Sequence, residues 1–439
     1  MRILIVGSGG REYAIAQKLI LENPDNHLYL IPGSEGMKKF GQCIAINPLE
    51  VDVVAEWAQK EEIDLVIIGP EGPLVQGLAN KCSKLGLKVF GHDQSTSLLE
   101  GSKSYAKRFM AKYQIPTATS YDVMDWNSGE LLIKDWPHEL PIVLKADGLA
   151  GGKGVVIAAS KQEALETLRL FLGGKYGEAS QKIVLEEFLS GIELSQHLLV
   201  DVNHDHRNYC LFPACQDHKK LNVDDKGPNT GGMGAFAPIP FLTEEDVDIM
   251  KRLIIDPTLK GLQTEGLIGR GVLFLGIMWT SSGPKLLEYN CRFGDPETQV
   301  LMAMMNENLL PLLLQVSEQR LCNNKTMVEI KPGTYITYVL AASGYPEKLD
   351  PPVEIPCLPI ENTSIIHSGT VLRNRRWFAH GGRVLSIVVS GNNLEQAQQK
   401  GKKIIAQVAW MGMQYRPDIG ERALRHHRLG KNLYDSWNS

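Results

Sequence analysis

The chain has 439 residues, of which 43% are hydrophobic and 22% charged, and its formal net charge is −4. This length predicts about three domains, and the composition excludes a largely disordered chain. The small net charge gives no reason to expect nucleic-acid binding, and no apolar run approaches the ~20 residues of a membrane span. Seven cysteines without a C-x-x-C pair predict reduced thiols in a cytoplasmic protein.

Apolar strand patterns alternate with helical patterns in the first hundred residues. Strands are expected at 3–6, 27–31, 64–68 and 88–90, and helices at 12–21, 51–60 and about 75–85. This alternation is typical of βαβ units and predicts a parallel sheet. A helix at 102–112 follows, and then a region of short strands with one or two helices at about 117–190.

The second half of the chain changes character near residue 330. Residues 191–326 form a mixed α/β unit that ends in an apolar helix at 309–316. Short β-rich runs follow at 335–341, 364–367 and 383–389, and a helix comes after them at 394–408. The pattern indicates an α/β protein with a small, β-rich C-terminal domain.

Glycine is unusually frequent, with 42 residues against 23 prolines, and the first glycine cluster is Gly7–Glu12. It follows a strand and begins a helix, so its backbone N–H groups could bind an anion. A dinucleotide is disfavoured because Glu12 occupies the third fingerprint glycine position and the second strand ends in Pro32–Gly33, without an acid for the ribose. A smaller phosphorylated compound and a tight turn without ligand both stay open. A second loop, 69–73, lies at the same carboxyl edge.

The densest glycine cluster, 148–154, joins two apolar strands. A Walker loop is excluded because it would lead from a strand into a helix, with Ser or Thr after the lysine, whereas Gly154 follows Lys153 here. A glycine hairpin that carries Lys145 and Lys153 can instead fold over a triphosphate and neutralise its charge.

A strand end at 286–290 offers oxygen ligands for a metal ion. Glu288 and Asn290 are two residues apart, so they share one face of the strand. Mg²⁺ takes few protein oxygens when phosphates and water complete its shell. Arg292, next on that face if the strand continues, could hold a carboxylate or phosphate in bidentate fashion.

Three further segments are weak signals when each is taken alone, because such residues are usually solvated or structural. They are Glu186–Leu189 with Glu193, the run Gln216–Lys220, and the glycine-rich loop 227–234. Together with the lysine hairpin and the metal-binding strand end, they indicate one ligand cleft.

Motifs along nearly the whole chain resemble those of the phosphoribosylamine–glycine ligase family of ATP-grasp enzymes. They include GSGGRE, GPEGPLVQGL, EGSKSYAKRFM, LKADGLAGGKGV, EEFLSGIE, QDHKK, GPNTGGMGAF, EYNCRFGDPETQ, HSGT, GGRVL and YRPDIGERAL. The resemblance implies a pre-ATP-grasp α/β domain at 1–102 and a two-part ATP-grasp domain at 103–326, with a glycine-rich lid at about 117–190. It also implies a C-terminal α+β domain at 327–424 and a tail at 425–439.

The same resemblance implies roles for individual residues. The hinge strand that meets adenine and ribose would be Glu186, Glu187, Phe188, Leu189 and Glu193. Phosphate and nucleotide partners would be Lys107, Lys145, Lys153, Lys220 and Asn229, and the Mg²⁺ or Mn²⁺ ligands would be Glu288 and Asn290. Arg292 and Asp217 would hold the carboxylate and amine of glycine in catalysis. The phosphoribosylamine would face Gly9, Gly10, Arg11, Glu12, Gly69, Pro70 and Glu71.

The implied reaction joins glycine to 5-phosphoribosylamine at the expense of ATP, through glycyl phosphate, in purine biosynthesis. Its partners would be these small molecules only, in a monomer or weak dimer. Several positions depart from the family pattern, among them Tyr13, Gly72 and Lys220. The first two lie on the acceptor side, so a diverged carboxylate–amine ligase with another acceptor or amino acid stays open as an alternative.

Overall fold

A computed structural model describes residues 1–151, 154–322, 326–347, 350–356 and 365–428. The expectation for Lys153 therefore lies outside the described residues. Within the described ranges, none of the helices combines the length and the apolar character needed to cross a membrane. The thiols of Cys43, Cys82, Cys215 and Cys291 are free, as expected.

The N-terminal domain is a five-stranded sheet in the order β3-β2-β1-β4-β5, in which all neighbours are parallel, as predicted. Its strands are β1 (Arg2–Gly7), β2 (His27–Pro32), β3 (Gly41–Cys43), β4 (Leu65–Ile68) and β5 (Val89–Phe90). Its helices are α1 (Gly10–Glu22), the 3₁₀ helix η1 (Glu35–Lys39), α2 (Val51–Lys60), α3 (Glu71–Val75) and α4 (Leu78–Lys84). The helix expected at about 75–85 is α4, which begins only at Leu78, after the turn at Gly77 with φ +85°. The short helix α3 begins inside the segment 69–73, which was expected to be a loop.

Two consecutive helices lead from this domain towards the lid. The sequence patterns indicated only the second one, α6 (Lys103–Lys112), and missed α5 (Gln94–Gly101). The side chains of Asp93 and Ser102 accept hydrogen bonds from Thr96 N and Tyr105 N and so begin the two helices.

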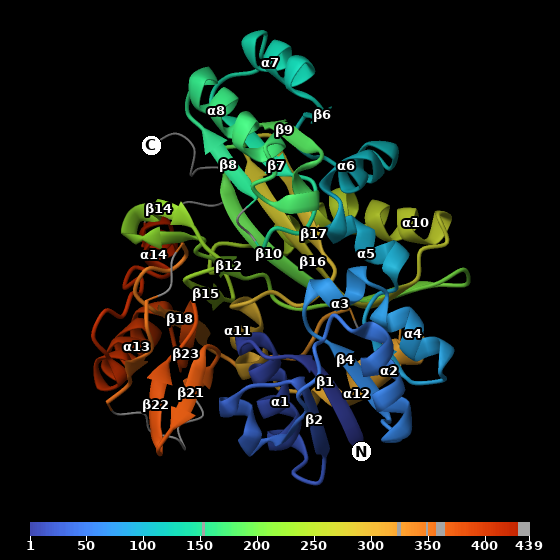
Figure 1. The fold of residues 1–439 in the computed structure, drawn as a ribbon, viewed down its shortest axis with the longest axis vertical. Coiled ribbons are helices and arrows are strands. Elements are labelled where there is room, and N and C mark those ends of the chain that lie inside the picture. The colour runs from blue at the N-terminus through green and yellow to red at the C-terminus, as the bar shows by residue number, and fades with distance from the viewer. Residues whose placement is uncertain (152–153, 323–325, 348–349, 357–364, 429–439) are drawn as a thin grey trace.

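The lid is a separate four-stranded antiparallel sheet, which stands at the top of Figure 1 with its own apolar core. Its strands, in the order β6-β9-β7-β8, are β6 (Ser120–Val123), β7 (Ile142–Ala146), β8 (Val155–Ala158) and β9 (Ile183–Glu187). Its helices are α7 (Trp126–Lys134), α8 (Lys161–Leu172) and the 3₁₀ turn η2 (Gly177–Ser180).

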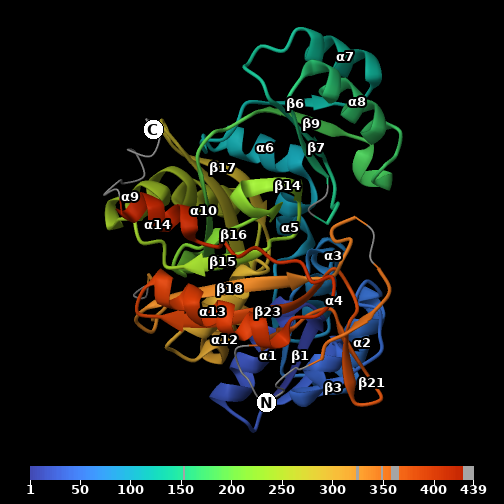
Figure 2. The ribbon, with the colours of Figure 1, turned by 90° about the vertical axis from the view of Figure 1, so that its left-hand side faces the viewer.

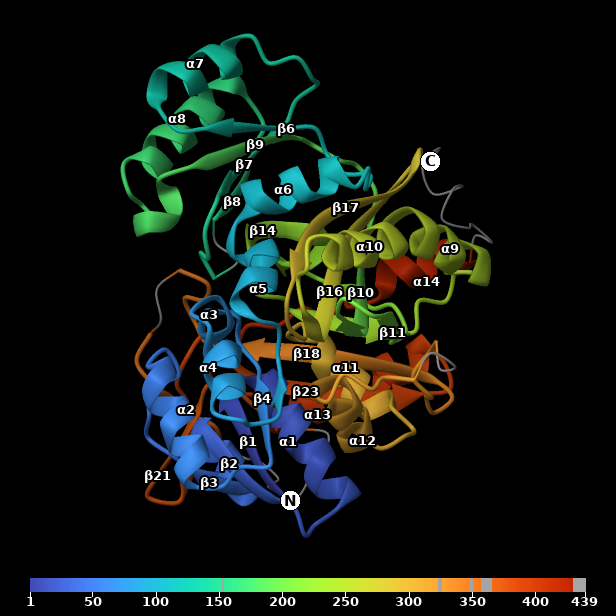
Figure 3. The ribbon, with the colours of Figure 1, turned by 90° about the vertical axis from the view of Figure 1, so that its right-hand side faces the viewer.

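Below the lid lies a central antiparallel sheet in the order β11-β10-β16-β17 (Figure 3). Its strands are β10 (Ile192–Val202), β11 (Arg207–Leu211), β16 (Gly269–Thr280) and β17 (Gly283–Asn290). The helical segments of this region are α9 (Glu244–Met250), the π-helical η4 (Lys251–Ile255), α10 (Asp256–Thr264), α11 (Glu297–Met304) and α12 (Leu309–Ser317).

The fourth sheet combines distant parts of the chain in the order β12-β15-β18-β23-β20. Its strands are β12 (Gln216–Asp217), β15 (Gly234–Ala237), β18 (Thr334–Ala341), β20 (Ile365–His367) and β23 (Arg383–Gly391). Near it lie the helices α13 (Leu394–Val408) and α14 (Glu421–Arg428) and the 3₁₀ turn η3 (Val223–Asp225). Two small sheets lie there as well: the hairpin of β13 (Lys220–Asn222) and β14 (Lys226–Asn229), and the three-stranded ribbon of β19 (Val353–Glu354), β21 (Thr370–Arg373) and β22 (Arg376–Ala379). Figure 2 shows α14 beside the β14 hairpin. The C-terminal domain is therefore joined to the segment 216–237 by a continuous sheet.

Candidate active site

A cleft of about 990 Å³ is lined by residues of the lid, the central sheet, the N-terminal domain and the C-terminal domain. The predicted site residues that line it are Arg11, Pro70, Glu71, Lys107, Lys145, Glu186, Glu187, Phe188, Leu189, Glu193, Asp217, Lys220, Asn229, Glu288, Asn290 and Arg292. Gly9, Gly10, Glu12 and Gly69 are not among its lining residues. One cleft thus brings together most of the residues that the motifs singled out.

Two lysines meet one buried carboxylate at the lid side of the cleft. Lys145 on β7 and Glu186 on the neighbouring β9 join at 2.9 Å between Nζ and Oε2, and Lys107 Nζ of α6 lies 3.1 Å from the same oxygen. Burial lowers the pKa of Lys107 to about 8, although Glu186 opposes that shift. Glu186 is only 2% exposed, which excludes the alternative that it is a solvated surface carboxylate.

The rest of the hinge segment shows three different environments. The Glu187 carboxylate accepts hydrogen bonds from Thr119 N (2.9 Å) and Thr119 Oγ1 (3.2 Å). Phe188 is 41% exposed at the cleft, whereas Leu189 is buried. An exposed aromatic ring beside a buried leucine offers an apolar surface for a flat base.

Lys219, which the sequence motifs did not single out, lies between Glu193 and the end of β17. Lys219 Nζ forms an ion pair with Glu193 and lies 3.9 Å from Glu288 Oε1. Burial alone would lower the pKa of Lys219, but Glu193, Glu288 and Asp217 together raise it above its ordinary value. The signal that could have found it is the two-residue spacing from Asp217 within QDHKK. Lys220, the residue selected instead, lines the cleft at the start of β13.

Glu288 and Asn290 lie together at the end of β17, as their spacing predicts. Asn290 Nδ2 donates to Glu288 Oε1 at 3.4 Å. Burial would raise the pKa of Glu288, but Lys219, Lys145 and Lys103 lower it to about 2, so the carboxylate is ionised at neutral pH. The amide nitrogen of Asn290 thus faces Glu288, and its oxygen accepts a hydrogen bond from Arg292. An ionised carboxylate with an amide on the same strand end, and with lysines for the phosphates around them, fits a hard divalent cation such as Mg²⁺ if the amide turns its oxygen to the ion.

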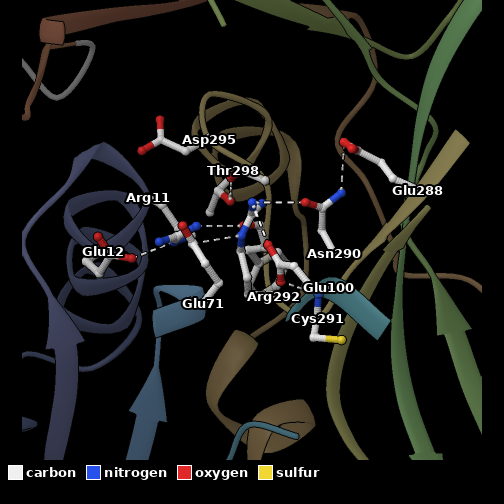
Figure 4. A network of polar contacts seen from close by, with 12 residues as sticks. Arg11, Glu12, Glu71, Glu100, Glu288, Asn290, Cys291, Arg292, Asp295 and Thr298 are labelled. Atoms are coloured by element: carbon white, nitrogen blue, oxygen red, sulfur yellow. Dashed lines mark hydrogen bonds and ion pairs between the residues drawn. The ribbon is translucent and has the colours of Figure 1, made fainter. Parts of the chain in front are cut away.

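Arg292 lies at the junction between the metal-binding strand and the N-terminal domain (Figure 4). The strand ends at Asn290, so the condition under which Arg292 would share its face is not met. Its guanidinium nevertheless reaches Asn290 Oδ1 (3.0 Å from NH2), Glu100 Oε1 (2.9 Å from NH2) and Glu71 Oε2 (3.4 Å from Nε). Glu100 also accepts a hydrogen bond from Cys291 N at 2.7 Å, and burial raises its pKa to about 7.

Arg11 joins the N-terminal loop to the same network. Its NH1 donates to Phe293 O at 2.9 Å, and its Nε contacts Glu12 Oε1 at 2.5 Å. The other oxygen of Glu12 accepts a hydrogen bond from Gly9 N at 2.8 Å, at the beginning of α1. Arg11 and Arg292, which donates to Phe293 O at 3.3 Å, thus share one carbonyl.

The N-terminal glycines make room for side chains beneath the cleft. A Cβ on Gly69 would lie 2.0 Å from Glu12 Oε1, and one on Gly10 would lie 2.5 Å from Gln299 Nε2. Tyr13 is buried between Phe40 and His367 and, like Gly72, does not line the cleft. The two acceptor-side departures therefore lie away from the lining of the site.

Asp217 lies opposite these loops, at the end of β12. Its Oδ1 accepts a hydrogen bond from His218 N at 2.7 Å. Burial, together with the nearby Glu297, raises the pKa of Asp217 above its ordinary value. The Asp217 carboxyl group can bind an ammonium group, and the positive charge of that group would favour the ionised form of Asp217.

Two antiparallel sheets, with lysines and the Glu288–Asn290 strand end between them, are the arrangement of an ATP-grasp enzyme, an ATP-dependent ligase. Family models support this class along the chain: the phosphoribosylglycinamide synthetase N domain matches residues 1–100, its ATP-grasp (A) domain 101–298 and its C domain 335–422. The chain belongs to the phosphoribosylglycinamide synthetase family.

Curated relatives agree with this assignment over the full length. The chain is 38% identical over 435 residues to a phosphoribosylamine–glycine ligase of Brucella melitensis, covering 98% of this chain and 100% of that protein. It is 39% identical over 434 residues to that of Vibrio cholerae, covering 97% and 99%. It is also 36% identical to the trifunctional purine biosynthetic protein adenosine-3 of Chironomus tentans, of which it spans 32%.

Solved structures show the same architecture. A phosphoribosylamine–glycine ligase from Thermotoga maritima superposes with a TM-score of 0.82 at 33% identity, covering 95% of this chain and 100% of that one. The biotin carboxylase domain of Hydrogenobacter thermophilus 2-oxoglutarate carboxylase, solved with MgADP, has a TM-score of 0.72 at 15% identity over 99% and 96% of the two chains. The second likeness concerns the fold alone.

Proposed function

We propose that this chain ligates glycine to 5-phosphoribosylamine and forms glycinamide ribonucleotide, ADP and phosphate. The observation that carries the proposal is that one cleft holds the ionised Glu288, its neighbour Asn290 and several lysines. The lysines are Lys145, Lys219 and Lys103. Full-length membership of the family supports the choice of substrates. A diverged ligase with another acceptor is not favoured, since neither Tyr13 nor Gly72 lines the cleft.

The chemistry requires charge neutralisation and positioning, without a side-chain nucleophile. A carboxylate oxygen of glycine attacks the γ-phosphorus of ATP, and the bond to the bridging oxygen of ADP breaks. The amine of phosphoribosylamine then attacks the carbonyl of glycyl phosphate, and phosphate leaves as the amine loses a proton. The first step brings two anions together, and in the second step negative charge develops on the carbonyl oxygen and on the leaving phosphate. Cationic side chains therefore lower both barriers.

The nucleotide half of the cleft has residues suited to each part of ATP. We assign the adenine to Glu186–Leu189, the ribose to Glu193, and the phosphates to Lys107, Lys145 and Lys220, with Lys153 from the hairpin. Lys219 is added to the phosphate partners because its ammonium lies between Glu193 and Glu288. Asn229 lies on the facing hairpin and lines the same cleft.

The other half suits glycine and the acceptor. Arg292 would bind the glycine carboxylate and Asp217 its amine, because their charges are opposite to those of the amino acid. Arg11, Pro70 and Glu71 would face the phosphoribosylamine, with Gly9, Gly10, Glu12 and Gly69 shaping these loops behind them. Arg11 is the cation of this set and could pair with the ribose phosphate.

ATP-grasp ligases of this class use ATP with Mg²⁺, and Glu288 and Asn290 would hold the ion, which would neutralise the phosphates when bound. Use of Mn²⁺ in its place is a further proposal. We also propose a cytoplasmic monomer or weak dimer that acts on small molecules, without nucleic acid or membrane partners. The domain limits at 102, 326 and 424, and the lid at 117–190, stay predictions.

An assay of the purified protein tests the proposal directly. ADP release is measured with ATP, glycine and freshly generated phosphoribosylamine, and the amide product is identified by mass spectrometry. ADP release must require glycine and phosphoribosylamine together. ADP release that does not depend on glycine, or that is equally fast with other amino acids, would overturn the assignment.

A further inference from the structure

Two C-terminal motifs, GGRVL and YRPDIG, have no part in the proposed chemistry. Their residues nevertheless contact the segment 218–231, which continues from Asp217 and carries Lys219, Lys220 and Asn229. Contacts of this kind exist at three separate points of the segment.

The first contact point is the turn of the β13–β14 hairpin. Arg416, only 2% exposed, pairs in bidentate fashion with Asp418, with 2.9 Å between Nε and Oδ1 and 2.6 Å between NH2 and Oδ2. Its NH1 donates to Asp225 Oδ1 (2.7 Å) and Lys220 O (3.2 Å), and Asp418 accepts from Asp224 N (3.0 Å).

These contacts stabilise an unfavourable turn conformation. Asp224 and Asp225 have φ angles of 58° and 53°, in the left-handed region that costs non-glycine residues free energy. A buried guanidinium is expensive unless its donors are satisfied, so the bidentate pairing of Arg416 fixes one geometry. The turn is therefore held from outside by the C-terminal segment.

The second contact point is His218, between the cleft residues Asp217 and Lys219. Gly420 N donates to His218 Nε2 at 3.1 Å. The backbone of His218 is in turn bonded to Gly234 O and Met233 N, at 2.9 and 2.8 Å. The YRPDIG motif thus contacts the segment beside Lys219 as well as at the hairpin turn.

The third contact point is Gly231. Arg383 NH1 donates to Gly231 O (2.7 Å) and Asp295 O (2.6 Å), and its NH2 pairs with Asp295 Oδ2 (3.2 Å). Gly231 N donates to Tyr345 Oη at 3.0 Å. Arg383 thereby connects the segment to the loop that follows the metal-binding strand.

We infer that Arg416 and Arg383 are positioning residues, through which the C-terminal domain holds segment 218–231 in the geometry that binds the ATP phosphates. The inference rests on the proposed function for the identity of the nucleotide. Both arginines also line the cleft. The inferred role depends on their contacts with the segment, which are Arg416 with Lys220 O and Asp225 and Arg383 with Gly231 O, and not on a contact with the substrate.

The decisive variants are Arg416→Met and Arg383→Met, with Arg416→Lys as the conservative change. Binding of MgATP is measured by calorimetry, and amide exchange of residues 218–231 by mass spectrometry. We expect Arg416→Met to weaken MgATP binding about tenfold and to raise the KM for ATP more than the KM for glycine. Exchange should accelerate in 218–231 and not in the lid. Arg416→Lys should lie between, since it keeps the charge and loses the planar fork.

Arg376→Lys is the matched control, because Arg376 forms an exposed ion pair with Glu354 (3.2 Å) in the same domain. It should leave exchange and MgATP affinity as in the wild type. Unchanged exchange in both methionine variants, or faster exchange with unchanged MgATP affinity, would overturn the inference. If Arg416→Met does not fold, Arg416→Lys and Arg383→Met provide the same test. Nucleotide binding needs no ligation, so loss of the proposed reaction in the wild type would be seen separately.

Discussion

The half of the cleft that we assign to the nucleotide and the half that we assign to the acceptor are constructed in different ways. In the nucleotide half, charged side chains from antiparallel strands meet directly, as Lys145 and Glu186 do across β7 and β9. In the acceptor half, the parallel strands β1 and β4 end in glycine loops, of which Arg11, Pro70 and Glu71 line the cleft. The difference teaches that the glycines of such a loop mainly allow side chains to pack closely against the backbone. The residue that lines the cleft, and so predicts binding, is the charged residue beside the glycines.

The largest effect is expected at the metal-binding strand end. Glu288→Ala removes an ionised oxygen donor and leaves Lys219, Lys145 and Lys103 without their common partner. We expect kcat for glycine-dependent ADP release to fall about 10³-fold. Steady-state kinetics with excess Mg²⁺ measure it, with Glu354→Ala as an exposed carboxylate control. Normal turnover in Glu288→Ala would remove this residue from the site.

A smaller and selective effect is expected in the acceptor half. Arg11→Met removes the guanidinium that contacts Phe293 O and Glu12, without changing the residues around Glu186. The KM for phosphoribosylamine should rise about tenfold, with the KM for ATP nearly constant. Equal increases in both KM values would mean that the two halves are not separable.

The pH dependence of kcat/KM for ATP tests the role of Lys107 in the nucleotide half. With the pKa of Lys107 near 8, its charge is present below that pH and lost above it. Under saturating glycine and acceptor, kcat/KM for ATP should fall above pH 8, by at most about tenfold per pH unit. Lys107→Arg should shift this decline to higher pH, and an unshifted profile would assign the decline to another group.

The depressed pKa of Lys107 also has a defined sign for stability. The folded state binds this proton less tightly than the unfolded chain does. The contribution of Lys107 to the free energy of unfolding therefore rises between pH 8 and its ordinary pKa of 10.5.

The smallest effect on activity is expected from Gly10→Ala. Its Cβ would lie 2.5 Å from Gln299 Nε2 and 2.7 Å from Ser368 Oγ, so the variant should lose ~1–3 kcal/mol of stability. Thermal unfolding measures this loss, and kcat/KM should change little in the folded protein. Gly72→Ala is the control, since its Cβ would meet only Leu49 Cδ2, at 3.0 Å in an exposed side chain. A specific loss of acceptor binding in Gly10→Ala would instead make this glycine a ligand contact.

Sequence patterns predicted the parts of the fold that depend on local interactions. The helices 51–60 and 394–408 and the parallel N-terminal sheet are confirmed, because periodic apolar residues act over one or two turns. The pattern missed α5, which a capping aspartate begins, and α3, which begins in a predicted loop. It also placed the beginning of α4 about three residues early, because Gly77 decides that boundary. The spacing of Glu288 and Asn290 was sufficient because a strand alternates over two residues.

By itself, then, the sequence determined the α/β class, the glycine loops and the family, and it predicted Glu288 and Asn290 as a metal-binding pair. Only the tertiary structure decided that Lys219 meets Glu193 and Glu288, that Glu100 holds Arg292, and that β12 and β15 complete the C-terminal sheet. Arg416 and Lys220 are 196 positions apart, yet they share a hydrogen bond. Such contacts depend on how the domains pack around the cleft, which no local pattern specifies.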